Sequence, residues 1–159
     1  MAEKIFSKVM LLSEGTGEGM QATRTAIELA ASAGADLHIL AVVDTNALKQ
    51  LLTNRIFVED EMREYDQELE RSSCKQIDYV AQLAAKHSVR YETHLLRGAI
   101  HTAVLQHQKQ SGADLFVMGA FRASTIRAAL VAREKQLIIE EIPCPVLLVP
   151  ASREQDRQR

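Results

Sequence analysis

Two stretches of this chain repeat one another: SAGADLHILAV at residues 32–42 and SGADLFVMGA at residues 111–120. Each runs through a glycine and an Ala-Asp-Leu step into an apolar run rich in Val, Ile, Leu or Phe. Glycine readily takes the left-handed conformation that ends a helix, and a continuous apolar run is typical of a strand buried on both faces. The repeat therefore predicts two copies of a helix-to-strand unit in an α/β protein with a parallel sheet.

Outside the repeat, apolar runs of strand length alternate with longer segments of helical period. A first helix, with small residues facing the sheet, is expected to end at Gly34, and Thr45–Val58 is expected to be irregular, with at most one short helical turn. The other expected helices are residues 61–87, 100–111 and 134–141. The expected strands are residues 8–12, 36–44, 90–98, 114–119 and 145–149.

Length and composition favour one ordinary domain. The chain has 159 residues, 47% of them hydrophobic and 25% charged, with a formal net charge of −2, which gives no bulk attraction to nucleic acid or to an anionic membrane. We expect a single domain over residues 1–150 and a disordered polar tail over residues 151–159. No apolar run approaches the roughly 20 residues of a membrane span, and the N-terminus does not look like a signal peptide, so a cytoplasmic location is expected.

Residues that often carry chemistry are sparse in this chain. Cys74 and Cys144 have no CxxC partner and no histidine at a metal-ligand spacing, and we expect both to be reduced packing residues. His38 and His94 lie in strands without a paired cysteine or carboxylate, and His107 follows the apolar face of its helix, which favours a packed histidine over a ligand. Because no metal signature, nucleophile elbow or Walker motif occurs either, we expect neither a metal site nor an enzyme.

Three longer segments resemble one protein family. Residues 97–121 (RGAIHTAVLQHQKQSGADLFVMGAF) and 143–150 (PCPVLLVP) resemble the C-terminal half of a universal stress protein domain, and residues 28–44 (ELAASAGADLHILAVVD) resemble its N-terminal half. The resemblance implies a doubly wound, five-stranded parallel sheet in the order 3-2-1-4-5, with helices on both faces. It also implies a homodimer and a role in the stress response rather than a defined catalytic activity.

One branch of that family binds ATP through a glycine motif. The pattern is glycine, two residues, glycine, nine residues, glycine, then serine or threonine. Counted from Gly119, the remaining positions hold Arg122, Ala132 and Arg133. A phosphate held by main-chain N–H groups requires close backbone approach, which the side chain of Arg122 hinders. The resemblance therefore implies a degenerate nucleotide site and no cofactor.

Arginines offer an alternative way to hold a phosphate. The planar guanidinium group binds phosphate oxygens well, so Arg122, Arg127 and Arg133 are candidate ligands for a nucleotide or a simple anion. The competing interpretation is that they are solvated charges on a loop and a helix.

The opposite wall of the expected crevice follows the first strand and reads SEGTGEGM at residues 13–20. Ser13, Glu14 and Gly15 are candidates for a nucleotide or anion site, and Glu14 can replace the aspartate that contacts adenine in the ATP-binding branch. Glu18 would repel a phosphate, and it also suits the positive end of the following helix.

Two functions remain open on the sequence. The favoured one is a small stress-response protein that acts by dimerisation and by contact with an unidentified protein. The alternative is a regulator that binds ATP or another adenine nucleotide through arginines in place of glycines. The last strand, Pro145–Pro150, lacks the lysines that guard a lone sheet edge, so we expect the homodimer to form through it.

Overall fold

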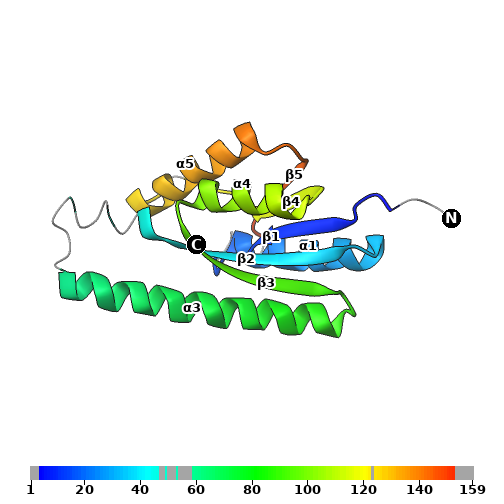
Figure 1. Cartoon of the computed structure of the whole chain (residues 1–159), viewed down its shortest axis with the longest axis horizontal. Coiled ribbons are helices and arrows are strands. Elements are labelled where there is room, and N and C mark those ends of the chain that lie inside the picture. The colour runs from blue at the N-terminus through cyan, green and yellow to red at the C-terminus, as the bar shows by residue number, and fades with distance from the viewer. Residues whose placement is uncertain (1–3, 47–48, 50–52, 54–58, 123, 153–159) are drawn as a thin grey trace.

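The computed structural model describes residues 4–46, 49, 53, 59–122 and 124–152 (Figure 1). Much of the predicted irregular segment Thr45–Val58, and nearly all of the polar tail, lie outside these residues. In chain order the elements are β1 (Lys8–Leu12), α1 (Gly17–Ala33), β2 (Asp36–Asp44), α3 (Glu59–Lys86), β3 (Tyr91–Gly98), α4 (Ile100–Ser111), β4 (Leu115–Gly119), α5 (Ile126–Glu141) and β5 (Val146–Val149).

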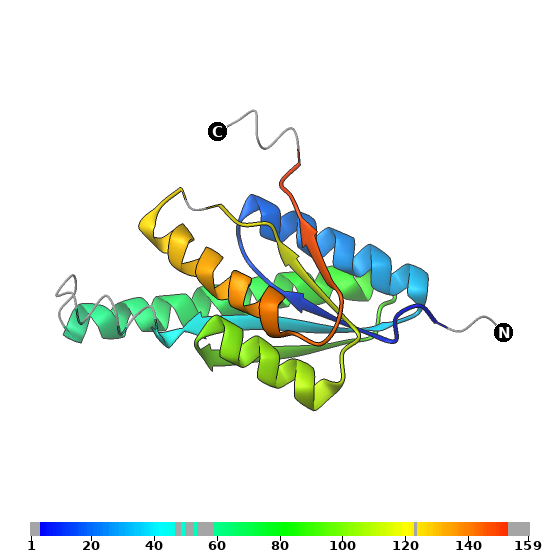
Figure 2. The ribbon, with the colours of Figure 1, turned by 90° about the horizontal axis from the view of Figure 1, so that it is seen from above.

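The five strands form one parallel sheet in the order β3-β2-β1-β4-β5, which confirms the predicted topology. Helices cover both faces, with α4 and α5 on one side and α1 and α3 on the other (Figures 1 and 2). Alternate side chains of each strand pack against the two helical layers. In β2, Leu37 and Ile39 pack toward α1 and α3, whereas Leu40 packs toward α4 and α5. Both faces of the central strands are therefore apolar, as a parallel sheet requires.

The degree to which a strand residue is buried depends on whether its strand is central or at an edge of the sheet. Within the strands expected from the sequence, Leu11, Leu12, Ile39, Ala41, Phe116, Val117 and Val149 are buried, as their apolar side chains predict. Leu95 and Leu147 are only partly buried, although they pack against the core. They lie on β3 and β5, the two edge strands, where one neighbouring strand is missing.

The repeated glycine and Ala-Asp-Leu steps have a clear structural role. Gly34 and Gly112 take the left-handed conformation, with φ of 65° and 70°, and end α1 and α4. Two residues after the second glycine, the Asp114 carboxylate accepts hydrogen bonds from the backbone N–H groups of Ser7 and Lys8 at 2.9 and 3.0 Å. This contact ties the start of β4 to the start of β1.

The last helix differs from its sequence-based boundary. It was expected from Glu134, but α5 begins at Ile126. The Thr125 side chain caps it by accepting a hydrogen bond from the N–H of Ala128 at 2.9 Å, and residues 128–132 (AALVA) contain no glycine to interrupt it. The helix therefore runs through positions that the ATP-binding branch of the resembling family assigns to its glycine motif.

The cysteines and the membrane expectation can also be compared with the structure. Both thiols are free. Cys144 is half-buried against the layer under α4 and α5, as expected of a packing residue. Cys74 is exposed on α3, so a packing role is wrong for it. Within the described residues, every helix is too short or too polar to cross a membrane.

Candidate functional site

A cleft of about 820 Å³ lies at the carboxyl ends of β1, β2 and β4. Its walls are the loops after β1 and β4, one side of α3 and the beginning of α5. This is the switch point of a doubly wound sheet, where successive crossovers go to opposite faces and ligands usually bind. The volume falls within the range of about 300 to 1,000 Å³ that is common for small-molecule sites.

The cleft brings together most, but not all, of the residues that the sequence singles out. Those that line it are Ser13, Glu14, Gly15, Arg122 and Arg127. Gly119 and Arg133 are not among its described lining residues. Gly119 is buried at the end of β4, and Arg133 is exposed along α5. The structure adds Asp44 and Lys135, which sequence reasoning did not assign to the site, and it also places Thr16, Ser124 and Thr125 among the lining residues.

Gly119 is required by packing within the protein. A β-carbon at this position would lie 2.8 Å from the carbonyl carbon of Glu18 and 2.8 Å from the nitrogen of Gly19. Gly19 is under a similar restriction, because its β-carbon would lie 2.4 Å from the carbonyl oxygen of Glu14. The beginning of α1 therefore packs directly on the end of β4. The first glycine of the motif serves this contact.

Lys135 of α5 pairs with Glu14 at the inner end of the cleft. Its Nζ donates hydrogen bonds to Glu14 Oε1 at 2.7 Å and to the carbonyl oxygen of Gly119 at 2.9 Å. The side chain of Lys135 is 3% exposed and that of Glu14 is 18% exposed. Burial raises the pKa of Glu14 above its ordinary value and outweighs the attraction of Lys135. The pair joins α5 to the ends of β1 and β4.

Ser13 provides a buried hydroxyl beside this pair. The residue is 8% exposed, and its Oγ makes no hydrogen bond with any residue that the structure describes. A buried polar group without a partner costs about 1 to 3 kcal/mol. Ser13 lines the cleft, but its Oγ is shielded from solvent, so a polar atom of a ligand can satisfy it only after the side chain rotates toward the cleft.

The arginines lie on the outer part of the cleft. Arg122 and Arg127 are both exposed, and the guanidinium carbon of Arg127 lies 6.0 Å from the ring centroid of Tyr65 on α3, a cation–π distance. Ala132 and Arg133 lie inside α5, where a backbone N–H bonds to the carbonyl four residues earlier. Main-chain donors at these two positions therefore serve the helix.

Comparison with known proteins assigns the family. The sequence model of the Universal stress protein family matches residues 6–150. The chain belongs to the universal stress protein family. A curated relative, "Universal stress protein YxiE" of Bacillus subtilis (strain 168), is 27% identical over 150 residues, which cover 91% of this chain and 99% of that protein.

Solved structures show the same fold at low sequence identity. Hypothetical protein MJ0577 gives a TM-score of 0.73 at 14% identity, covering 93% of this chain and 98% of that one. A universal stress protein in complex with cAMP gives 0.62 at 20% identity, covering 92% and 98%. The universal stress protein from Archaeoglobus fulgidus in complex with dAMP gives 0.57 at 15% identity, covering 91% and 98%.

Proposed function

We propose that this universal stress protein has no enzymatic activity, acts through dimerisation and protein contacts, and does not retain ATP in its cleft. The observation that carries the proposal is the start of α5 at Ile126. Because the helix has already formed before Ala132, the backbone at Ala132 and Arg133 offers no free N–H groups to a phosphate.

Two further features of the cleft support weak binding of ATP. Glu14, the candidate for contact with adenine, is already engaged by Lys135 at 2.7 Å. The arginines on the outer part of the cleft are exposed side chains, and each one that a ligand immobilises loses about 0.5 to 1.5 kcal/mol of conformational freedom. Attraction without a preformed backbone cradle favours loose binding.

Calorimetry with magnesium and ATP tests this part of the proposal. We expect no saturable heat at micromolar protein concentration, and native mass spectrometry of the purified protein should show no retained ATP. Saturable micromolar binding of ATP by the unmodified protein contradicts the proposal, provided that Arg122→Ala abolishes it. Arg133→Ala is the matched control, because Arg133 is an arginine of α5 that does not line the cleft.

The proposed dimer uses the edge of β5. This strand is the last of the sheet, next to β4 (Figure 2), and Leu148 on it is 40% exposed. An unguarded apolar edge is readily covered by the same edge of a second copy about a two-fold axis. In analytical ultracentrifugation we expect a dimer that Leu148→Lys converts to a monomer. A monomeric parent, or a dimer that Leu148→Lys leaves intact, contradicts this interface.

A second candidate function is binding of an adenine mononucleotide as a regulatory ligand. The unpartnered hydroxyl of Ser13 in a cleft of about 820 Å³ favours it. It is also consistent with cAMP and dAMP in proteins of the same fold. In the same calorimeter, AMP and cAMP should then bind more tightly than ATP, and Ser13→Ala should weaken them. Equal heats for the unmodified protein and for Ser13→Ala argue against this candidate.

A further inference from the structure

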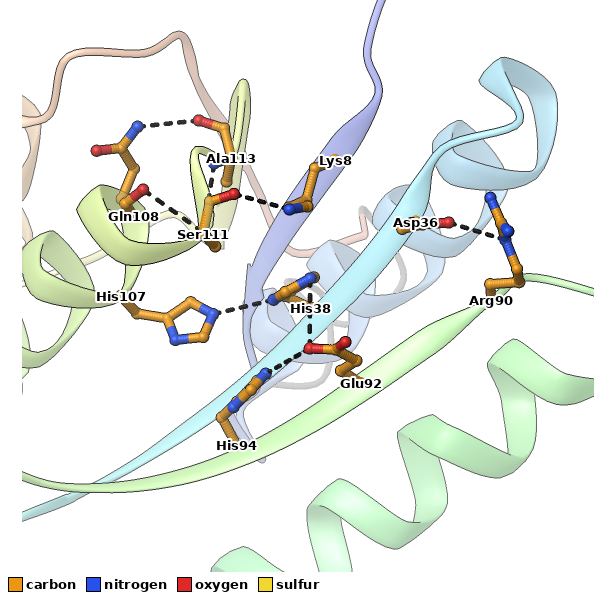
Figure 3. Close-up of polar contacts among 10 residues, drawn as sticks. All are labelled: Lys8, Asp36, His38, Arg90, Glu92, His94, His107, Gln108, Ser111 and Ala113. Carbon is orange, nitrogen blue, oxygen red and sulfur yellow. Dashed lines mark hydrogen bonds and ion pairs between the residues drawn. The ribbon is translucent and has the colours of Figure 1, made fainter.

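Three histidines meet on the face of the sheet that α4 covers, away from the cleft. His38 lies on β2, His94 on β3 and His107 on α4. In the register of the parallel pair, His38 is opposite Glu92 and Leu40 is opposite His94, so both strand histidines point to the same face. Figure 3 shows the three imidazole rings turned toward one another, with Glu92 beside the two strand histidines.

The distances between these rings are those of a group of metal ligands. One nitrogen from each imidazole can be chosen so that all three lie within 4.8 Å of one another. His38 Nδ1 and His107 Nε2 are 3.0 Å apart. Two imidazole nitrogens on a tetrahedral Zn²⁺ stand about 3.3 Å apart, given Zn–N bonds of about 2.0 to 2.1 Å. The two nitrogens of His38 and His107 are therefore almost as far apart as two ligands of one Zn²⁺ ion.

The third ligand needs only a modest adjustment. The side chain of His94 is 29% exposed, so its ring can rotate more easily than the rings of His38 and His107, whose residues are 6% and 8% exposed. The centroids of the His94 and His107 rings are 4.3 Å apart. A small rotation of His94 brings its nitrogen to the other two.

The surroundings suit a cation held by neutral imidazoles. Glu92 Oε2 lies 3.6 Å from His38 Nε2, the ring nitrogen other than the one that faces His107, and 3.3 Å from His94 Nε2. A carboxylate that accepts the second N–H of a ligating histidine fixes its ring and raises its basicity. His38 and His107 are both nearly buried, and burial favours the neutral imidazole, which is the form that binds a metal.

The cleft beside the cluster and the number of its ligands suit a metal ion that keeps one coordination position for an exchangeable water. A second cleft, of about 210 Å³, runs between α4 and the end of β3 and is lined partly by His107. We propose that His38, His94 and His107 form a binding site for a divalent first-row transition metal, Zn²⁺ in the first instance, with Glu92 as the outer carboxylate. Three imidazole ligands and a fourth position open to water match Zn²⁺ and exclude Ca²⁺ and Mg²⁺, which prefer oxygen ligands.

Metal titration of untagged protein, stripped with a chelator, tests the proposal. We expect one Zn²⁺ per chain by competition with a chromogenic chelator, and one Co²⁺ per chain with the intense visible absorption of a tetrahedral site. His94→Gln should weaken Zn²⁺ binding by at least about 100-fold, and Glu92→Gln by about 10- to 100-fold. Because His94 is partly exposed, His94→Gln should fold, which circular dichroism can check.

The matched control is His87→Gln, since His87 is exposed at the end of α3. It should bind Zn²⁺ like the parent. The proposal is overturned by an absence of saturable one-to-one binding of Zn²⁺ and Co²⁺, or by affinities that His94→Gln leaves unchanged. Equal losses in His94→Gln and His87→Gln also overturn it, because they would mean adventitious binding by surface histidines.

Discussion

The cleft and the histidine cluster are both polar sites in an otherwise apolar sheet, but they are assembled differently. The cleft takes its polar groups from the loops that follow β1 and β4 and from α5, so most of them lie close to strand ends that the apolar runs of the sequence mark. The cluster joins His38, His94 and His107, which are distant in sequence and meet only through strand register and the packing of α4. The residues of a loop site can therefore be predicted from the sequence, whereas the residues that meet on a sheet face cannot.

The buried polar groups of the two regions also find their partners in different ways. The cleft buries a charged pair, in which Lys135 compensates Glu14 at 2.7 Å. In the cluster, burial lowers the pKa values of His38 and His107, and one hydrogen bond joins these two rings. Two opposite charges satisfy each other, whereas the lone pairs of uncharged imidazoles can bind a cation. The predictions below separate these two behaviours.

The largest effect is expected from breaking the charged pair. Glu14→Leu leaves the ammonium group of Lys135 buried without its counter-charge, and we expect it to lower the free energy of unfolding by about 3 kcal/mol. Lys135→Met should have a similar effect, because it leaves Glu14 unpaired. Urea denaturation followed by circular dichroism measures both.

The double variant Glu14→Leu/Lys135→Met is the matched control for these losses. It removes both charges, so we expect it to be more stable than either single variant. If the two single losses simply add in the double variant, Glu14 and Lys135 are not energetically coupled, and the pair does not hold α5 to the ends of β1 and β4.

A smaller effect, confined to the other region, is expected from zinc. At a concentration 100 times its Kd, a ligand stabilises the bound form by about 2.7 kcal/mol, which corresponds to roughly 100-fold slower amide exchange in segments that open together. We expect this slowing in β3, whose pairing with β2 the metal would clamp, and not in the first turn of α5. Hydrogen exchange with mass spectrometry, with and without Zn²⁺, measures it. Equal slowing in both segments would contradict a local clamp.

The fold could be predicted from the sequence because the residues that end its helices and begin its strands are close together and occur twice. Gly34 and Gly112 end helices, the Ala-Asp-Leu steps begin strands, and continuous apolar runs fill the central strands. The predicted start of the last helix at Glu134 is wrong because the alanines before it are already helical and Thr125 caps them. A threonine followed by alanine-rich sequence was the available signal.

The residues of the two sites could be predicted from the sequence only in part. Five predicted residues line the cleft because they lie in the loops after β1 and β4 or in the first turn of α5. Lys135 is not predictable in this way, because nothing in the helical pattern distinguishes it from the exposed charges around it. His38 and His94 are 56 residues apart, and no ligand spacing along the chain connects them. Their shared face depends on the register of β2 against β3, which a single sequence does not specify.

A gain of function of intermediate size is expected from restoring the glycine pattern. Arg122→Gly with Ala132→Gly and Arg133→Ser should tighten ATP binding about tenfold, the value of one additional hydrogen bond of roughly 1.4 kcal/mol. The same variant should lose about 1 kcal/mol of stability, because glycine inside α5 weakens the helix. Calorimetry and urea denaturation measure the two effects. Unchanged ATP affinity in a folded variant would show that the backbone does not reach the cradle geometry.

The smallest effect is a pH dependence carried by Glu14. Burial raises its folded-state pKa above the ordinary 4.5, so the folded protein binds this proton more readily than the unfolded chain does. The stability that follows from this is fully present below pH 4.5 and is lost as the pH rises through the folded-state pKa. Relative to Glu14→Gln, the parent should therefore lose stability as the pH rises above 4.5 and passes through the raised folded-state pKa of Glu14.

The exposed carboxylate of Glu28 on α1 provides the control for this pH profile. Glu28→Gln should follow the parent over the whole range, because Glu28 lies on the exposed side of α1 and outside the buried pair. Urea denaturation at a series of pH values gives the three curves, and subtracting them cancels the other titrating groups. A parent that instead gains stability over Glu14→Gln as the pH rises would mean that the attraction of Lys135 outweighs burial. The inner end of the cleft would then hold its charged pair without cost, and the contrast with the neutral histidine cluster would be sharper still.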